Sequence, residues 1–88
     1  MKKYANLVKN VHYYLCYLFL ETADFRNAIK HGELLLEQFG GKLSKKTRFT
    51  CYQYLSEAYT MEGQYDKAIG IIDESQGVIE EETKRDQD

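Results

Sequence analysis

The sequence of 88 residues contains no proline, only two cysteines, and no apolar run as long as a membrane span. Proline breaks helix interiors, so its absence predicts a chain that is nearly all helix. A spanning helix needs about 18–20 consecutive apolar residues, so no membrane partner is expected. A chain this short allows one small domain with a thin stability margin, because it buries a small share of its surface.

Cysteine usage and charge exclude two further classes of protein. Two cysteines are too few for a disulfide framework, which predicts a reducing compartment, the cytosol or the nucleus. Twelve basic residues against 14 acidic ones give a net charge of −2. Nucleic-acid binding needs a basic face, so no nucleic acid is expected among the partners.

The candidates for metal or catalytic chemistry are two histidines and two cysteines. His12 and His31 fall on different helices, and Cys16 and Cys51 are 35 residues apart. A zinc site needs about four ligands in close register, and no third group orients a Cys–His pair for nucleophilic catalysis. The glycines lack the spacing of a phosphate-binding loop. We therefore predict no enzyme activity, metal, other cofactor or small-molecule substrate, and a buried structural thiol at Cys16.

One segment occurs twice in the chain. Residues 18–29 read LFLETADFRNAI and residues 58–69 read AYTMEGQYDKAI. Both copies have aromatic residues at their second and eighth positions and end in Ala-Ile, and they are 40 residues apart. A fixed period in this range is typical of stacked helical hairpins, because one hairpin cannot bury its apolar face alone.

Hydrophobic periodicity predicts four helices, at about 4–21, 25–38, 45–61 and 65–80, followed by a charged tail at 81–88. The domain at 1–80 then holds two hairpins, at about 4–39 and 45–80. Asp24 and Ser44 are expected to cap the second and third helices with their side chains. Gly32 is expected to let a neighbouring helix approach closely. Gly40-Gly41 is expected to end the second helix in the left-handed conformation.

The apolar residues of two helices do not all fit one face. The first helix has a predicted core stripe of Leu7, Val8, Val11, Leu15, Leu18 and Phe19. Off this stripe lie Tyr13, Tyr14, Tyr17 and Leu20, so the helix is either sandwiched or offers one side to a partner. The fourth helix has a predicted stripe of Tyr65, Ala68, Ile69, Ile72, Gln76 and Ile79. Off it lie Ile71 and Val78, which indicates a further contact on the outer side.

These residues resemble tetratricopeptide repeats, whose helix pairs recur about every 34 residues. The second unit matches the family pattern at Tyr52, Leu55, Ser56, Tyr59, Gly63, Tyr65 and Ala68. The first unit matches at Leu15, Cys16, Phe19, Phe25 and Ala28, but has His12 in place of an aromatic residue and Ala23 in place of glycine. The resemblance implies an all-α fold of two stacked antiparallel helical hairpins, part of a right-handed solenoid. A four-helix bundle is the structural alternative.

A narrower likeness concerns several short runs. The tenth subunits of the Ccr-Not deadenylase complex have a stretch similar to Ala28-Ile29-Lys30-His31-Gly32, Leu35-Leu36, Arg48-Phe49, Glu57-Ala58 and Ala68-Ile69. That family consists of non-catalytic helical-repeat scaffolds. The likeness implies a piece of an mRNA-turnover assembly, with the complex's eleventh subunit and the N-terminal part of its large scaffold as partners.

In tetratricopeptide repeats the first helix of each pair lines the inner surface. This mapping predicts a partner-binding groove formed by Asn10, Tyr13, Tyr14, Tyr17, Leu20, Gln53, Tyr54, Glu57 and Thr60. Tyrosine favours binding because it offers a large rigid contact with one polar tip. The alternative is that Tyr13 or Tyr14 packs internally. Chaperone-binding members clamp a terminal carboxylate at positions that here hold Tyr13, Tyr17, Gln53 and Glu57, so an acidic C-terminal peptide is not the expected ligand.

The predicted function is a non-catalytic scaffold module that binds a partner peptide or helix through its inner helices. The start at Met1-Lys2-Lys3, with little sequence after the fourth helix, is what a piece of a longer repeat protein would show. Two repeats are marginal alone, since about three are needed for stability. The alternative function is therefore self-association into a homo-oligomer through exposed repeat ends, including hairpin swapping across Gly40-Gly41.

Overall fold

The computed structural model describes residues 2–87, with side chains described for residues 6–77. It has four helices and a short 3₁₀ turn, in the order α1 (Lys2–Glu21), α2 (Phe25–Phe39), η1 (Gly40–Lys42), α3 (Lys45–Met61) and α4 (Tyr65–Gln87). No strand occurs in this part of the chain, so the predicted all-α fold of helical hairpins is confirmed. The backbone of α4 extends over most of the predicted charged tail. The side chains of Val78 and Ile79, and all of Asp88, lie outside the described residues.

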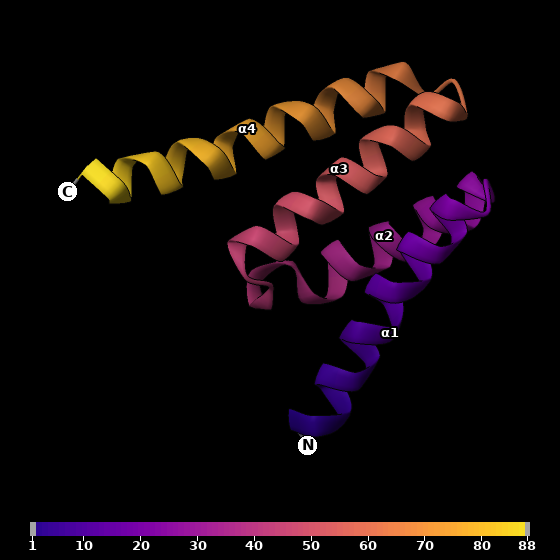
Figure 1. Cartoon of the computed structure of the whole chain (residues 1–88), viewed down its shortest axis with the longest axis horizontal. Coiled ribbons are helices and arrows are strands. Elements are labelled where there is room, and N and C mark those ends of the chain that lie inside the picture. The colour runs from indigo at the N-terminus through magenta and orange to yellow at the C-terminus, as the bar shows by residue number, and fades with distance from the viewer. Residues whose placement is uncertain (1, 88) are drawn as a thin grey trace.

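The helices form a flat layer in chain order. Each helix packs against the next, and α1 also contacts α3. In Figure 1, α2 and α3 lie between α1 and α4, and the layer measures 42 × 37 × 18 Å. The α1–α2 and α3–α4 pairs are the two expected hairpins, whereas their continuation as a right-handed solenoid stays a prediction.

The turns that close the two hairpins have the same hydrogen bonds, 40 residues apart. After α1, three N–H groups donate to carbonyls at 3.0, 3.1 and 2.8 Å: Thr22 to Leu18, Ala23 to Leu20, and Asp24 to Phe19. After α3, the equivalent bonds are also 3.0, 3.1 and 2.8 Å: Glu62 to Ala58, Gly63 to Thr60, and Gln64 to Tyr59. The repeat in the sequence is therefore also a repeat of backbone geometry.

The helices α2 and α3 begin and end within one residue of their predicted bounds, but only one of the three predicted capping features is present. Ser44 caps α3, because its Oγ accepts from the Thr47 N–H at 3.1 Å. Asp24 makes no side-chain cap on α2, because its carboxylate accepts from Asn27 Nδ2 at 2.7 Å instead. Gly40 is right-handed (φ −49°) rather than left-handed. The chain leaves α2 through η1, which carries Leu43 into the core.

The core lies where α2 meets α3. Leu35 and Leu55 are fully buried there, and Cys16 is buried as predicted. A Cβ added at Gly32 would lie 2.8 Å from Leu55 Cδ2 and 3.2 Å from Cys16 Sγ. The predicted close approach at Gly32 is therefore confirmed, since any side chain would collide with its neighbours.

The buried faces of α1 and α4 differ from the predicted stripes. On α1, the exposed side includes three residues predicted to face the core: Leu7, Val11 and Leu18. The buried side includes Cys16 and Leu20, with Tyr13 and Phe19 packed against it. On α4, Ala68 is buried and Ile71 packs on the core, whereas the exposed side includes Tyr65, Ile69 and Ile72. The reason is that both helices are apolar on two sides, so packing rather than periodicity selects the buried one.

Candidate functional site

Three tyrosines from two helices meet on one surface. Tyr13 and Tyr17 are four residues apart, so they share a face of α1. Their ring centroids lie 6.0 and 5.8 Å from that of Tyr54 on α3, with interplanar angles of 47° and 49°. Tilted rings at this separation attract one another. The contact between α1 and α3 therefore assembles an aromatic surface from residues far apart in the sequence.

These tyrosines and Tyr14 line a hollow of about 340 Å³, and we call the four residues the tyrosine cluster. Tyr14 is 71% exposed and Tyr17 41%, so the hollow is open to a ligand. Burial, and then a hydrogen bond with Tyr13, raise the pKa of Tyr54 to about 12. Tyr54 is therefore a neutral phenol at physiological pH, able to donate or accept a hydrogen bond.

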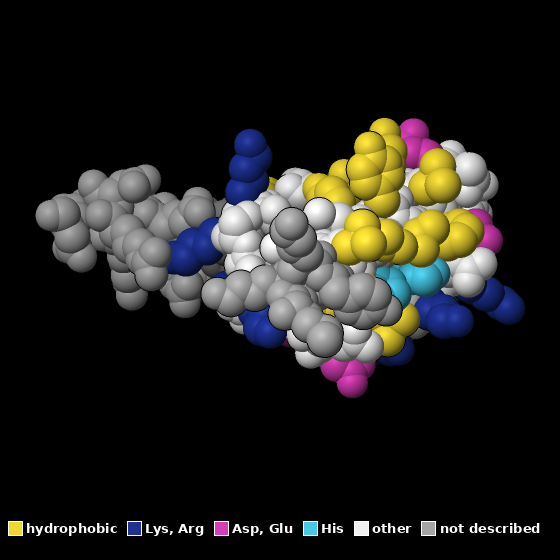
Figure 2. All heavy atoms as spheres, turned by 90° about the horizontal axis from the view of Figure 1, so that it is seen from below, with side chains coloured by type: hydrophobic (Ala, Val, Ile, Leu, Met, Phe, Trp, Pro, Cys, Tyr) yellow, Lys and Arg dark blue, Asp and Glu magenta, His cyan; other side chains and the backbone are white. Residues whose placement is uncertain are grey.

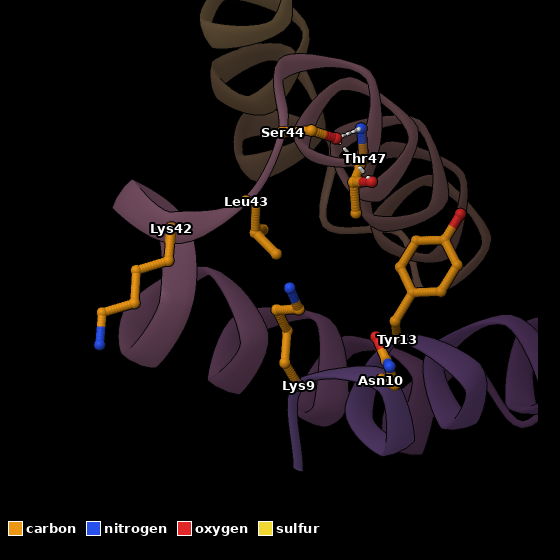
Figure 3. A pocket seen from close by; sticks show the side chains of 7 residues that line it. All are labelled: Lys9, Asn10, Tyr13, Lys42, Leu43, Ser44 and Thr47. Carbon is orange, nitrogen blue, oxygen red and sulfur yellow. Dashed lines mark hydrogen bonds between the residues drawn. The ribbon is translucent and has the colours of Figure 1, made fainter. Parts of the chain in front are cut away.

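A second hollow, of about 380 Å³, adjoins the tyrosine cluster at Tyr13. Its lining comes from α1, η1 and the start of α3, and comprises Lys9, Asn10, Tyr13, Lys42, Leu43, Ser44 and Thr47. Figure 3 shows Lys9 reaching toward Leu43, while Lys42 extends outward from the opposite wall. An aromatic hollow thus lies beside one that is lined by two lysines, of which Lys9 reaches inward.

A third hollow, of about 350 Å³, lies on the outer face of α1. Its apolar lining includes residues that recur at spacings of four and three, and we call these the α1 stripe: Leu7, Val11, Tyr14 and Leu18. Each is at least 46% exposed. Tyr14 lines this hollow as well as the tyrosine cluster, so one apolar surface continues from α3 around α1. Figure 2 shows hydrophobic side chains gathered in this way on one face of the molecule.

The outer face of α4 carries a similar set, the α4 stripe, formed by Tyr65, Ile69 and Ile72. These residues are 63%, 58% and 45% exposed. Forty residues earlier, the equivalent positions on α2 are Phe25, Ile29 and Gly32. Ile29 and Gly32 are buried, and Phe25 packs on the core. The positions that are buried or packed on the core in α2 are therefore exposed in α4.

Four of the nine predicted groove residues form the tyrosine cluster, and Asn10 lines both hollows beside it. Gln53, Glu57 and Thr60 are exposed on α3, outside the three hollows. Leu20 is 9% exposed and belongs to the core, so its side chain is not offered to a ligand. Of the two tyrosines with an alternative internal role, Tyr13 packs on the core and Tyr14 does not.

Sequence reasoning missed the exposure of the α1 stripe and the position of Lys9 beside Tyr13. The signal for the stripe was present, because the first helix has two apolar sides. No local signal places Lys9 and Lys42 on one hollow, because they are 33 residues apart and lie on different elements.

Histidine, cysteine and carboxylate side chains are the groups that metal binding or nucleophilic catalysis would use. No group of three or more His, Cys, Asp or Glu residues converges among the described side chains. Burial raises the pKa of Cys16 to about 11 and that of Cys51 to about 12, so neither thiol is an activated nucleophile. Across the described residues, no helix combines the length and hydropathy required to span a bilayer.

No protein-family model matches the chain, and neither does any of the curated proteins or solved structures compared with it. The resemblance to tetratricopeptide repeats therefore depends on the quoted residues alone.

Proposed function

We propose that this chain is a non-catalytic interaction module that binds a segment of a partner protein at the tyrosine cluster. The observation that carries the proposal is the contact of Tyr13 and Tyr17 with Tyr54, which leaves an open aromatic hollow between α1 and α3. Exposed tyrosines in a hollow are typical binding hot spots, because a rigid ring loses little entropy on binding.

The neighbouring surfaces define the chemistry of the partner segment. An apolar side chain would fill the tyrosine cluster, with the phenol groups as hydrogen-bonding partners at its rim. Lys9, in the hollow that adjoins Tyr13, and Lys42, on the far wall of that hollow, favour an acidic side chain near that anchor. These lysines do not occupy the positions that clamp a terminal carboxylate in chaperone-binding relatives. The proposed ligand is therefore an internal peptide or helix with one apolar anchor and an adjacent acidic residue.

Selection from a random peptide library on the whole chain tests this proposal. The selected peptides should share the apolar–acidic pattern, and Tyr17→Ala should weaken their binding at least about tenfold, as expected for a hot-spot tyrosine. Tyr65→Ala on α4 is the matched control and should bind normally. Unchanged affinity of a Tyr17→Ala, Glu57→Ala variant that is folded by circular dichroism would exclude this surface. The Ccr-Not resemblance supplies two further probes, the purified eleventh subunit and the N-terminal segment of the large scaffold.

A second candidate function, self-association, is favoured by the internal repeat. The α1 helix is the 40-residue equivalent of α3, and α2 is that of α4. Within the chain, α2 packs against α3. The same contact between copies would place the α4 stripe of one copy on the α1 stripe of the next. Tyr14, the equivalent of Tyr54, would then lie beside Gln53 and Glu57 of the neighbouring copy.

Charge supports this arrangement. The α1 helix has three lysines and one glutamate, whereas α4 has seven acidic and three basic residues. Opposite charges at the two ends favour a head-to-tail contact over contacts between like ends. A head-to-tail contact that does not close gives open chains of copies.

Complementary charge variants test self-association. Wild-type protein should increase in mass with concentration in sedimentation experiments, whereas Val11→Glu and Ile69→Glu should each be monomeric, because a buried unpaired charge is costly. An equimolar mixture of the two variants should form a one-to-one dimer, since each supplies the intact face that the other lacks. Wild-type protein that stays monomeric at the highest soluble concentration would exclude this function.

A further inference from the structure

The two histidines meet across the first hairpin. His12 on α1 and His31 on α2 have their Nδ1 atoms 3.1 Å apart, so one ring nitrogen donates to the other. Their ring centroids are 5.3 Å apart. Phe19 stacks on the His31 ring with a centroid distance of 5.5 Å and an interplanar angle of 14°, which holds that ring in place. Both histidines are half-buried, and Figure 2 shows histidine side chains at the surface beside the hydrophobic patch.

We propose that His12 and His31 form a chelating site for a divalent transition-metal ion of borderline softness, Zn²⁺, Ni²⁺ or Cu²⁺. An ion bound to imidazole nitrogen at about 2.05 Å would subtend an angle of about 98° with nitrogens 3.1 Å apart. This angle lies between the 90° of square-planar and octahedral sites and the 109° of a tetrahedral site. Because the ion would lie off the line that joins the two nitrogens, each ring would have to turn its Nδ1 lone pair toward it. On binding, the donor ring would change tautomer, its proton moving through solvent from Nδ1 to Nε2, so that both Nδ1 atoms offer a lone pair to the metal.

The ligand set defines the type of site. Two imidazoles select Zn²⁺, Ni²⁺ or Cu²⁺ over Mg²⁺ and Ca²⁺, which prefer oxygen ligands. No third His, Cys, Asp or Glu joins the pair among the described side chains. The remaining coordination positions would therefore hold water or a donor atom from a bound partner. Because the two ligands lie on different helices, the ion would cross-link α1 to α2.

The test uses the whole chain with Zn²⁺, Ni²⁺ and Cu²⁺ as probes and Mg²⁺ as the negative control. We expect one ion per chain by isothermal titration calorimetry. We also expect a rise in Tm of roughly 4–8 °C or more at saturating Zn²⁺, because an ion that binds only the folded chain stabilises it. Zn²⁺ should shift the imidazole resonances of both histidines in the NMR spectrum, and Mg²⁺ should shift neither.

Variants locate the site. His12→Gln and His31→Gln should each lower the affinity for Zn²⁺ at least about tenfold, because one imidazole cannot chelate. Lys46→Gln, an exposed lysine on α3, is the matched control and should bind Zn²⁺ normally. The NMR measurement on wild-type protein decides the matter if a histidine variant fails to fold. Zn²⁺ binding that leaves either histidine ring unshifted, or no binding in the range where Zn²⁺ is soluble, would overturn the proposal.

Discussion

Ala23 and Gly63 hold the same left-handed turn conformation at the ends of α1 and α3, with φ angles of 61° and 77°. The left-handed region costs a residue with a Cβ about 1–2 kcal/mol, and glycine avoids this cost. Ala23→Gly should therefore raise the free energy of unfolding by about 0.5–1 kcal/mol, after the larger unfolded-state entropy of glycine is subtracted. Gly63→Ala should lower it by a similar amount.

Urea denaturation of both variants and the wild type measures these changes. Each variant is the control for the other, because the two turns have equivalent hydrogen bonds. The substitutions are the reverse of each other, so their effects on the free energy of unfolding should have opposite signs. Destabilisation by Ala23→Gly would show that the turn does not strain this residue.

Gly32 lets the side chain of Leu55 on α3 come close to α2 in the core. An added Cβ there would lie 2.8 Å from Leu55 Cδ2 and 2.9 Å from its Cγ. Since the closely packed core cannot yield freely, Gly32→Ala should destabilise the protein by about 1–3 kcal/mol. Gly70→Ala is the control, because nothing lies within 4 Å of that position in α4. It should stabilise the protein by up to about 1 kcal/mol through helix propensity.

Thermal and urea denaturation should show that Gly32→Ala is less stable than the wild type and that Gly70→Ala is more stable. Equal effects would mean that helix propensity, rather than the contact with Leu55, decides the outcome at Gly32.

Local signals explain how much of the fold could be predicted. The ends of the first three helices follow from the repeated aromatic–alanine pattern and from Ser44, because turns and caps depend on residues close in sequence. Even so, Asp24 bonds Asn27 rather than the backbone, since a short polar side chain has several local partners.

Features that are set by the packing between helices could not be predicted from the sequence. Leu7 and Leu20 are both apolar residues of α1, yet one is exposed and the other buried, because the helix has two apolar sides and its neighbours cover only one. The tyrosines of the candidate site were predicted from the family mapping, but the contact of Tyr13 with Tyr54 depends on the α1–α3 crossing. Likewise, the contact of His12 with His31 depends on the register of α1 against α2.

The two buried thiols make stability sensitive to alkaline pH. Burial raises the pKa of Cys16 from 9.0 to about 11; burial, with Cys16 as a minor cause, raises that of Cys51 to about 12. Above pH 9 the unfolded chain loses thiol protons that the folded chain retains. The free energy of unfolding should therefore be unaffected by these groups below about pH 9 and fall as pH rises through about 11.

Urea denaturation at a series of pH values measures this slope. Cys51→Ala should give a shallower alkaline decline, despite a lower starting stability from the lost side-chain volume. A decline identical to that of wild type would show that other groups, such as the tyrosines, dominate the alkaline range.

Tyr59 joins α3 to α2 through a hydrogen bond from its hydroxyl to Glu33 Oε1. Burial, and then this bond, raise the pKa of Tyr59, whose residue surface is 4% exposed. Tyr59→Phe keeps the ring packing and the nearby Lys67 ammonium, 5.8 Å from the ring centroid, but removes the donor.

We expect Tyr59→Phe to lower the free energy of unfolding by about 1 kcal/mol. This is the low end for a bond to a charged acceptor, because Glu33 is exposed and its carboxylate regains water. Tyr65→Phe, the same change at an exposed position, should stay within about 0.5 kcal/mol of wild type. If Glu33→Ala, which removes the acceptor, abolishes the effect of Tyr59→Phe in a double-mutant cycle, the bond is the cause. Equal losses in the Tyr59 and Tyr65 variants would exclude it.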